Sequence, residues 1–140
     1  MSESVYFIDT NIFLYSVGRD HPLKPAAVRI IHRIRDGQIT AVINMEIVQE
    51  ILYHFQSIRQ LSIGVQLAKD ATSIAARICP VEEIDLSLAI ELLESHPKIQ
   101  TRDAFHAATM IHHGIKEIIS TDPHFDLIHE IKRIDPVKLS

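Results

Sequence analysis

The sequence predicts an α/β fold in which a central, mainly parallel sheet lies between two layers of helices. Short apolar runs alternate along the chain with segments whose apolar residues recur at helical spacing. Short strands separated by helices favour parallel pairing, because each connection crosses over the sheet. The chain has 140 residues, of which 46% are hydrophobic. That length suits one compact domain over residues 1–140 and is too short for two.

The first half of the chain contains two predicted strands and four predicted helices. A β-rich run ends at Asp9, and the prolines at 22 and 25 suit the start of a helix that stops near Gly37. Asn44 is a favourable N-cap for a long helix. In chain order we expect a strand at 5–8, helices at 10–17 and 26–35, a strand at 39–43, and helices at 45–59 and 62–78.

The second half repeats the alternation. Pro80 ends the preceding helix, and Val81 begins a short extended piece. Asp85 and Thr101 are candidate N-caps, and Gly114 suits a helix C-terminus. We expect helices at 85–94 and 102–113, a strand at 117–120, a helical turn near Phe125 and a last strand at 131–134.

Composition narrows the function classes. The formal net charge of −4 argues against a protein that binds nucleic acid through a broad basic surface. The single cysteine, Cys79, rules out an intrachain disulfide, and we expect it to be buried. Neither a signal peptide nor a membrane-spanning run is predicted. We therefore expect a cytoplasmic protein that does not contact a membrane.

Two acids lie just beyond the ends of predicted strands. Asp9 comes after the first strand, and Asp122 follows the strand near residue 119. Ligands of open α/β sheets bind beyond the carboxyl ends of strands, so the two carboxylates would meet if these strands are neighbours. Each residue also has a purely structural alternative, because Asp is a favoured helix cap and turn residue.

Two further acids lie on predicted helices. Glu50 lies at the flank of the apolar stripe of its helix, whereas Glu46 lies opposite that stripe. Asp103 lies in the first turn of its helix and shares a face with His106. Glu50 could equally be a solvated acid, and Asp103 could serve only to interact with the helix dipole.

If these acids converge, they require a cation. Four carboxylates without Lys or Arg partners would repel one another and raise their pKa values. A bound divalent cation removes that cost, and oxygen ligands of this type suit Mg²⁺ or Mn²⁺. The nine histidines form no zinc motif, and we expect most of them to be exposed or half-buried.

Four short motifs together resemble the PIN-domain family, in particular its VapC-type toxin ribonucleases. They are the segment 7–13 with Asp9-Thr10-Asn11, the segment 48–52 around Glu50, the segment 102–108 with Asp103-Ala104-Phe105-His106, and the segment 119–125 with Asp122. The resemblance extends over residues 5–137. It implies a metal-dependent endoribonuclease, most simply the toxin of a toxin–antitoxin pair.

The resemblance also implies roles for individual residues. Asp9, Glu50, Asp103 and Asp122 would be the catalytic, metal-binding acids, with Asp9 and Asp103 as the main ligands. Thr10, Asn11 and Thr121 would be supporting polar residues, and Asp126 and Glu46 are alternates for the fourth and second acids. Candidate RNA contacts are Lys24, Arg29, Arg33 and Arg102. Implied partners are an RNA substrate, an antitoxin that covers the pocket and a second copy of the chain, with residues 47–78 as candidate dimer surface.

Several alternatives stay open on sequence alone. A phosphatase of the haloacid-dehalogenase kind would carry a second Asp where this chain has Asn11. A receiver-type signalling module would need an acid next to Asp9 and a phosphoacceptor Asp where the second strand ends at Asn44. Within the resembled family, an RNA-processing nuclease without an antitoxin and an inactive binding scaffold remain alternatives.

Overall fold

Five short strands form one parallel sheet in the computed structural model, which describes residues 5–139. The strands are β1 (Val5–Ile8), β2 (Thr40–Asn44), β3 (Arg77–Cys79), β4 (Glu117–Ile119) and β5 (Lys132–Ile134). Their order across the sheet is β3-β2-β1-β4-β5, and every pairing is parallel. The predicted parallel α/β architecture is thereby confirmed.

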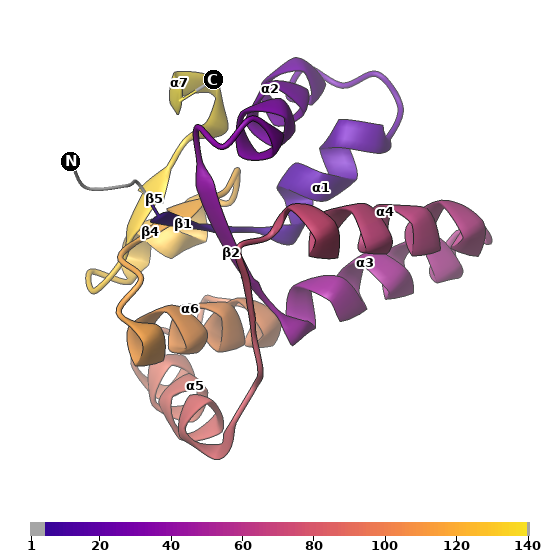
Figure 1. Ribbon diagram of the computed structural model, residues 1–140. Helices are drawn as coiled ribbons and strands as arrows, with labels where there is room; N and C mark the ends of the chain where they lie inside the picture. Colours follow the sequence, from indigo (N-terminus) through magenta and orange to yellow (C-terminus); the bar gives the residue numbers. More distant parts are fainter. Residues whose placement is uncertain (1–4, 140) are drawn as a thin grey trace.

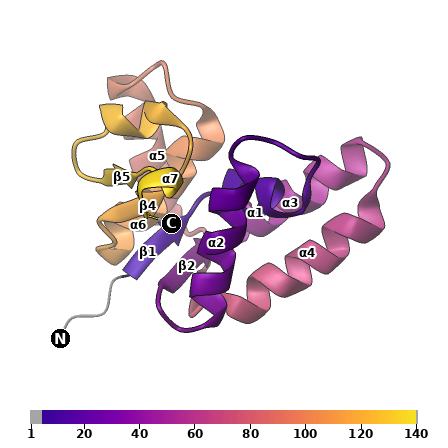
Figure 2. The ribbon, with the colours of Figure 1, turned by 90° about the horizontal axis from the view of Figure 1, so that it is seen from above.

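Helices cover both faces of the sheet. They are α1 (Thr10–Val17), α2 (Lys24–Arg35), α3 (Met45–Ser57), α4 (Leu61–Ile74), α5 (Glu83–Ser95), α6 (Thr101–His113) and α7 (Pro136–Leu139), with a 3-10 turn, η1 (Pro123–Leu127). Helices α1, α2 and α7 lie on one side of the sheet and α5 and α6 on the other (Figure 1). The α3–α4 hairpin extends to one side, as the view from above also shows (Figure 2).

Burial on both faces explains why the strands lack an alternating pattern. Phe7 and Ile8 of β1, Ile43 of β2, and Ile118 and Ile119 of β4 are all fully buried. A strand covered by helices on both sides reads as a continuous apolar run. Among the described residues, no helix is both long and apolar enough to span a membrane.

Two predicted N-caps hold helices at the end of strands. The Asn44 side chain accepts a hydrogen bond from the backbone N–H of Ile47 at 3.0 Å, which begins α3 directly after β2. Asp9 accepts from the N–H of Thr10 at 2.8 Å and begins α1 directly after β1. These caps stabilise the sharp strand-to-helix transitions that surround the carboxyl edge of the sheet.

The helix predicted over residues 62–78 is wrong at its C-terminal end. Helix α4 ends at Ile74, and residues 77–79 instead form β3 at the edge of the sheet. The N–H of Ala76 bonds to the carbonyl of Ala41 at 2.8 Å, and β3 then pairs with β2. The apolar residues of this short segment fit a helix or a strand equally well, so pairing with β2 decides that it forms a strand. Cys79 is fully buried, as expected.

Two predicted N-caps in the second half are displaced. Helix α5 begins at Glu83 with Glu82 as its N-cap, and Asp85 is the third residue of a capping box whose carboxylate accepts from the N–H of Glu82 at 2.8 Å. Helix α6 begins at Thr101 itself, after Gln100. The helices are therefore as expected, but their first turns start earlier than predicted.

Candidate active site

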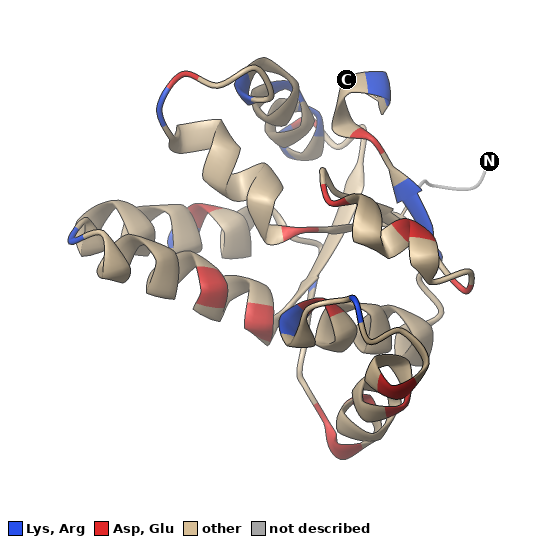
Figure 3. Ribbon diagram, turned by 180° about the vertical axis from the view of Figure 1, so that it is seen from behind, with Lys and Arg blue, Asp and Glu red and all other residues tan. Residues whose placement is uncertain are grey.

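All four acids expected at the site line one pocket at the carboxyl edge of the sheet. The pocket has a volume of about 320 Å³. It is lined by Asp9, Thr10, Asn11, Leu14, Glu50, Tyr53, His54, Ser57, Gln100, Arg102, Asp103 and Asp122. Acidic stretches at the end of β1 and on α3 lie on the same side of the molecule (Figure 3). The structure thus brings together residues that are far apart in the sequence.

Parallel pairing of β1 with β4 places Asp9 beside the segment that contains Asp122. Ile8 pairs with Ile119, and the N–H of Asp9 donates to the carbonyl of Ile119 at 3.1 Å. The next residue of that segment, Ser120, is fully buried and connects the two acids. Its hydroxyl donates to Oδ2 of Asp9 at 2.6 Å and accepts from the N–H of Asp122 at 3.0 Å.

Asp9 combines its structural role with a place in the pocket. Oδ1 caps α1 through Thr10, while Oδ2 accepts from Ser120 and from the Asn11 side-chain amide at 3.2 Å. Only 4% of Asp9 is exposed. Burial raises its pKa above the ordinary aspartate value, although His106, Ser120 and Thr10 act in the opposite direction.

Glu50 is held at both carboxylate oxygens. His106 Nε2 lies 2.8 Å from Oε1, and the hydroxyl of Thr10 donates to Oε2 at 2.5 Å. The side chain is 14% exposed, so Glu50 is not a freely solvated acid. Burial acts to raise its pKa. Hydrogen bonds from His106 and Thr10, together with the charges of His106 and Arg102, nevertheless lower the pKa below the ordinary glutamate value.

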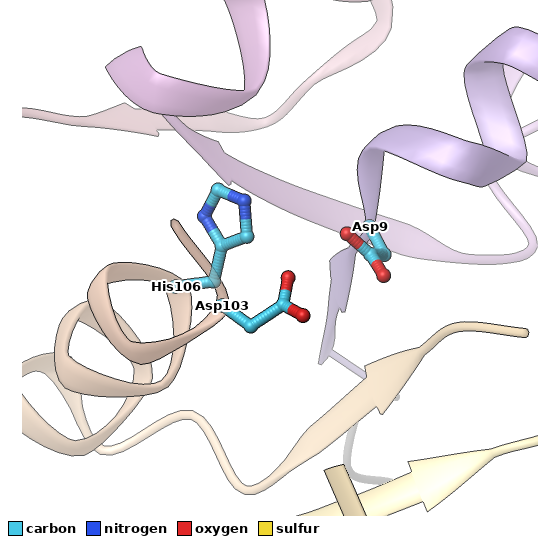
Figure 4. A group of neighbouring side chains, drawn as sticks. All are labelled: Asp9, Asp103 and His106. Carbon is cyan, nitrogen blue, oxygen red and sulfur yellow. The ribbon is translucent and has the colours of Figure 1, made fainter. Parts of the chain in front are cut away.

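Asp103 is the most perturbed acid in the pocket. Burial, the negative charge of Asp9 and a hydrogen bond with Asp122 raise the pKa of Asp103 to about 7. In Figure 4 the carboxyl group of Asp103 points from α6 toward Asp9 at the end of β1. An acid held in this way is stabilised by a cation placed between the two carboxyl groups.

His106 is a component of the site that the sequence alone did not identify. It is completely buried, one helical turn from Asp103 on the same side of α6 (Figure 4). Burial acts to lower its pKa, but the neighbouring Glu50, Asp9 and Asp103 together raise the pKa above the ordinary histidine value. Every other histidine is exposed or half-buried, as expected, so His106 is the exception, and its spacing from Asp103 already placed both residues on one face.

The donor set of the pocket fits a divalent cation. Ligand atoms of Asp9, Asp103 and His106 lie within 4.8 Å of one another. The Oδ1 atom of Asn11 is buried, with no hydrogen-bond partner among the described residues. Carboxylate and amide oxygens are preferred by hard cations, and a cation would offset the repulsion that raises the pKa of Asp103.

The alternate acids lie outside this pocket. Asp126 is exposed, and both its oxygens accept from the Arg133 guanidinium, at 3.1 and 3.2 Å. Glu46 is half-buried and lines a neighbouring shallow pocket with Arg102. Thr121 is half-buried and is not among the residues lining the acidic pocket, and the fully buried Ser120 makes the hydrogen bonds with Asp9 and Asp122 instead.

Only one of the four candidate RNA-binding cations lines the acidic pocket, namely the exposed Arg102. Lys24 and Arg29 line a different pocket on α2. The guanidinium of Arg33 donates to the carbonyl of Leu139 at 2.5 Å and so connects α2 to the C-terminal helix. Basic residues of α2 lie on the far side of α1 from α3 (Figure 3).

Comparison with known proteins agrees with this geometry. A family model described as the PIN domain matches residues 6–131. Ribonuclease VapC13 of Mycobacterium tuberculosis is 34% identical over 128 residues, which cover 91% of this chain and 97% of that protein. Ribonuclease VapC23 of the same organism is 33% identical over 116 residues, which cover 83% of this chain and 91% of that protein.

Solved structures share the fold at lower sequence identity. VapC20 of M. tuberculosis, described as a sarcin-ricin loop cleaving toxin, superposes with a TM-score of 0.74 at 18% identity, covering 89% of this chain and 94% of that one. VapBC2 from Rickettsia felis, bound to a DNA fragment from its promoter, superposes with a TM-score of 0.69 at 16% identity. The match covers 94% of this chain and 99% of that one. Because the family model and the relatives match along nearly the whole sequence, this chain belongs to the PIN-domain family and, within it, to the VapC ribonucleases.

Proposed function

We propose that this protein is an endoribonuclease that hydrolyses phosphodiester bonds of RNA with the help of divalent cations. The observation that carries the proposal is the convergence of Asp9, Glu50, Asp103 and Asp122 on one pocket, two of them almost completely buried. Gathering several buried carboxylates costs free energy that a bound cation would offset. Membership of the VapC ribonucleases supplies the reaction class.

The pocket's oxygen donors favour Mg²⁺ or Mn²⁺ over Zn²⁺. Asp9 and Asp103 would be the main ligands, with Glu50 and Asp122 binding directly or through water. A bound cation lowers the pKa of water and neutralises the charge that builds up on the phosphate. Hydrolysis by water leaves a 5′-phosphate and a 3′-hydroxyl, because the RNA 2′-hydroxyl is not the nucleophile.

The chain's own residues hold this arrangement. Ser120 and Asn11 fix the carboxylate of Asp9, and Thr10 fixes that of Glu50. Arg102 lines the pocket and is the candidate contact for an RNA phosphate. A positive charge there would orient the substrate without occupying a position that a cation needs.

The biological role we propose is that of the toxin in a toxin–antitoxin pair. Support comes from the family and from fold neighbours that were solved as VapBC assemblies. An antitoxin that covers the acidic pocket would suppress cleavage. A homodimer is also part of the proposal, because residues 47–78 expose several large apolar side chains, namely Tyr53, Ile58, Leu61, Ile63 and Val65.

The test is cleavage of structured and unstructured RNA by purified protein with Mg²⁺, with Mn²⁺ and with a chelator. We expect metal-dependent cleavage that Asp9→Asn and Asp103→Asn abolish without unfolding the chain. Asp36→Asn, an exposed acid at the end of α2, is the matched control. Cleavage that persists in both pocket variants at saturating Mg²⁺ would remove their assigned role. Metal binding without cleavage would favour an inactive scaffold.

A further inference from the structure

A chain of buried polar groups lies behind Glu50 and is not part of the acidic set. It consists of Thr109, Asn44 and His106, each 0% exposed. Asn44 is the last residue of β2, whereas His106 and Thr109 lie one turn apart on α6. Because a buried polar network is costly unless its members are satisfied, its hydrogen bonds define which atoms donate and which accept.

The orientation of the Asn44 amide follows from its role as N-cap. Its Oδ1 accepts the N–H of Ile47, so its Nδ2 must be the atom that faces α6. Nδ2 lies 2.9 Å from Oγ1 of Thr109 and 3.2 Å from Nδ1 of His106. The hydroxyl of Thr109 donates to the carbonyl of Phe105 at 3.0 Å, so its oxygen is free to accept from Asn44.

This arrangement fixes the tautomer of His106. Because Nδ2 of Asn44 can only donate, Nδ1 of His106 must accept from it, and Nε2 carries the proton of the neutral ring. Nε2 then donates to Oε1 of Glu50 at 2.8 Å. With Thr10 bound to Oε2, neither carboxylate oxygen of Glu50 can turn away without breaking a hydrogen bond.

We propose that His106 is a positioning residue, locked by Asn44 as an Nε2–H donor, that holds Glu50 in place for the cation. The inference rests on the proposed function of the pocket as a cation site. It assigns to His106 a role different from that of a ligand, although its nitrogen lies within 4.8 Å of ligand atoms of Asp9 and Asp103. To bind a cation, Nε2 would have to give up both its proton and Glu50.

The tautomer is measured directly by ¹⁵N NMR of the imidazole nitrogens in the full chain, without RNA. The His106 signals are assigned by their loss in His106→Gln. We expect a protonated Nε2 and an unprotonated Nδ1, with the Nε2 proton retained after saturation with Mg²⁺. A proton on Nδ1, whether alone or together with one on Nε2, or loss of the Nε2 proton on addition of Mg²⁺, would overturn the proposal.

Variants test the positioning role through the affinity for Mg²⁺, measured by calorimetry. His106→Leu fills a similar volume without a donor, and we expect it to weaken Mg²⁺ binding about 10- to 100-fold, the usual cost of losing a partner behind a ligand. His106→Gln keeps an N–H near the Nε2 position and should restore binding to within several-fold. Unchanged affinity in His106→Leu, or no rescue by Gln, would contradict the proposal.

His112→Gln is the matched control, because His112 is on the same helix and lies 2.8 Å from the Asp85 carboxylate, outside the pocket. It should leave Mg²⁺ affinity unchanged. If His106→Leu does not fold, the NMR measurement and the Gln variant still decide. Neither readout uses RNA, so a failure of the nuclease proposal would appear separately, as wild-type protein that binds Mg²⁺ but does not cleave.

Discussion

Asp103 illustrates how a single side chain can be unfavourable for the fold and useful for the site. The residue is 6% exposed and faces two other acids, and its pKa is raised to about 7. A carboxyl group in these surroundings binds a proton or a cation in preference to remaining charged and alone. If the pocket is the proposed cation site, protons and divalent cations would therefore compete at this residue.

Cation binding should weaken as the pH falls. Because the pKa values of Asp103 and Asp9 are both raised, protons compete with the cation at and below about pH 7. We expect Mg²⁺ affinity and RNA cleavage to decrease steadily from pH 8 to pH 6. Calorimetric titrations at both pH values check this, and an affinity that is equal at the two would contradict the raised pKa.

Asp103→Asn should stabilise the metal-free protein while it abolishes cation binding. A raised carboxyl pKa means that the folded chain binds the proton more tightly, so the free energy of unfolding falls as the pH rises from about 4 to about 7. At pH 8 the substitution should raise the free energy of unfolding by roughly 1 to 4 kcal/mol.

Urea denaturation of the metal-free protein measures this effect. At pH 4.5 the difference between wild type and Asp103→Asn should be much smaller than at pH 8, because the wild-type carboxyl group is then protonated. A variant less stable than wild type at pH 8 would show that the charge of Asp103 is already compensated within the metal-free fold.

At the scale of elements, the ends of strands carry the predictable part of the site. Asp9 could be placed at the pocket from sequence because it directly follows a buried strand, and Asp122 follows another. What sequence could not provide is the register between the strands. Pairing of Ile8 with Ile119 brings Ser120, rather than the predicted Thr121, into contact with Asp9.

Dependence on tertiary pairing also explains why the sequence did not predict strand β3 or the place of His106 in the site. Strand β3 exists because its backbone pairs with β2, and its residues alone fit the end of a helix equally well. The partners of His106 lie on β2 and α3, more than 50 residues away in sequence. Local patterns therefore predicted the helices and the acids, whereas the contacts that hold the acids depend on tertiary structure.

The α3–α4 hairpin, which carries Glu50, depends on close packing at Gly64. A Cβ atom at this position would lie 2.7 Å from Cβ of Phe55, closer than packed atoms tolerate. We expect Gly64→Ala to lower the free energy of unfolding by about 1–3 kcal/mol, as overpacking usually does. Ser62→Ala, at an exposed position of the same helix, should have little effect.

Urea denaturation measures the free energy of unfolding of Gly64→Ala and Ser62→Ala against that of the wild type. Higher intrinsic helix propensity of Ala would act in the opposite direction by about 1 kcal/mol. A Gly64→Ala variant as stable as wild type would show that the two helices can move apart without cost, and thus that Glu50 is held by its hydrogen bonds alone.

At the scale of the whole molecule, charge is distributed unevenly. The net charge is −4, and no residue of α2 lines the acidic pocket, whereas Lys24 and Arg29 of α2 line a different one. A metal-free pocket would repel the RNA backbone, and bound divalent cations would reverse the sign there. RNA affinity should therefore depend on occupancy of the pocket as well as on basic side chains.

Arg102 and Arg33 should separate RNA binding from folding. Arg102→Ala should weaken RNA binding and reduce its salt dependence, because Arg102 lines the pocket. Arg33→Ala should instead lower stability, because its guanidinium holds the C-terminal helix through Leu139. RNA titrations at several salt concentrations and urea denaturation distinguish the two, and the reverse pattern would assign RNA contact to α2.

Direct titration of Mn²⁺ into the chain, followed by electron paramagnetic resonance, tests whether the acids form a cation site. The wild-type protein should bind Mn²⁺ in competition with Mg²⁺. Asp9→Asn and Asp103→Asn should each lose that binding while they remain folded, and Asp36→Asn should keep it. Mn²⁺ affinity that is absent from the wild type, or unchanged in both pocket variants, would contradict the account.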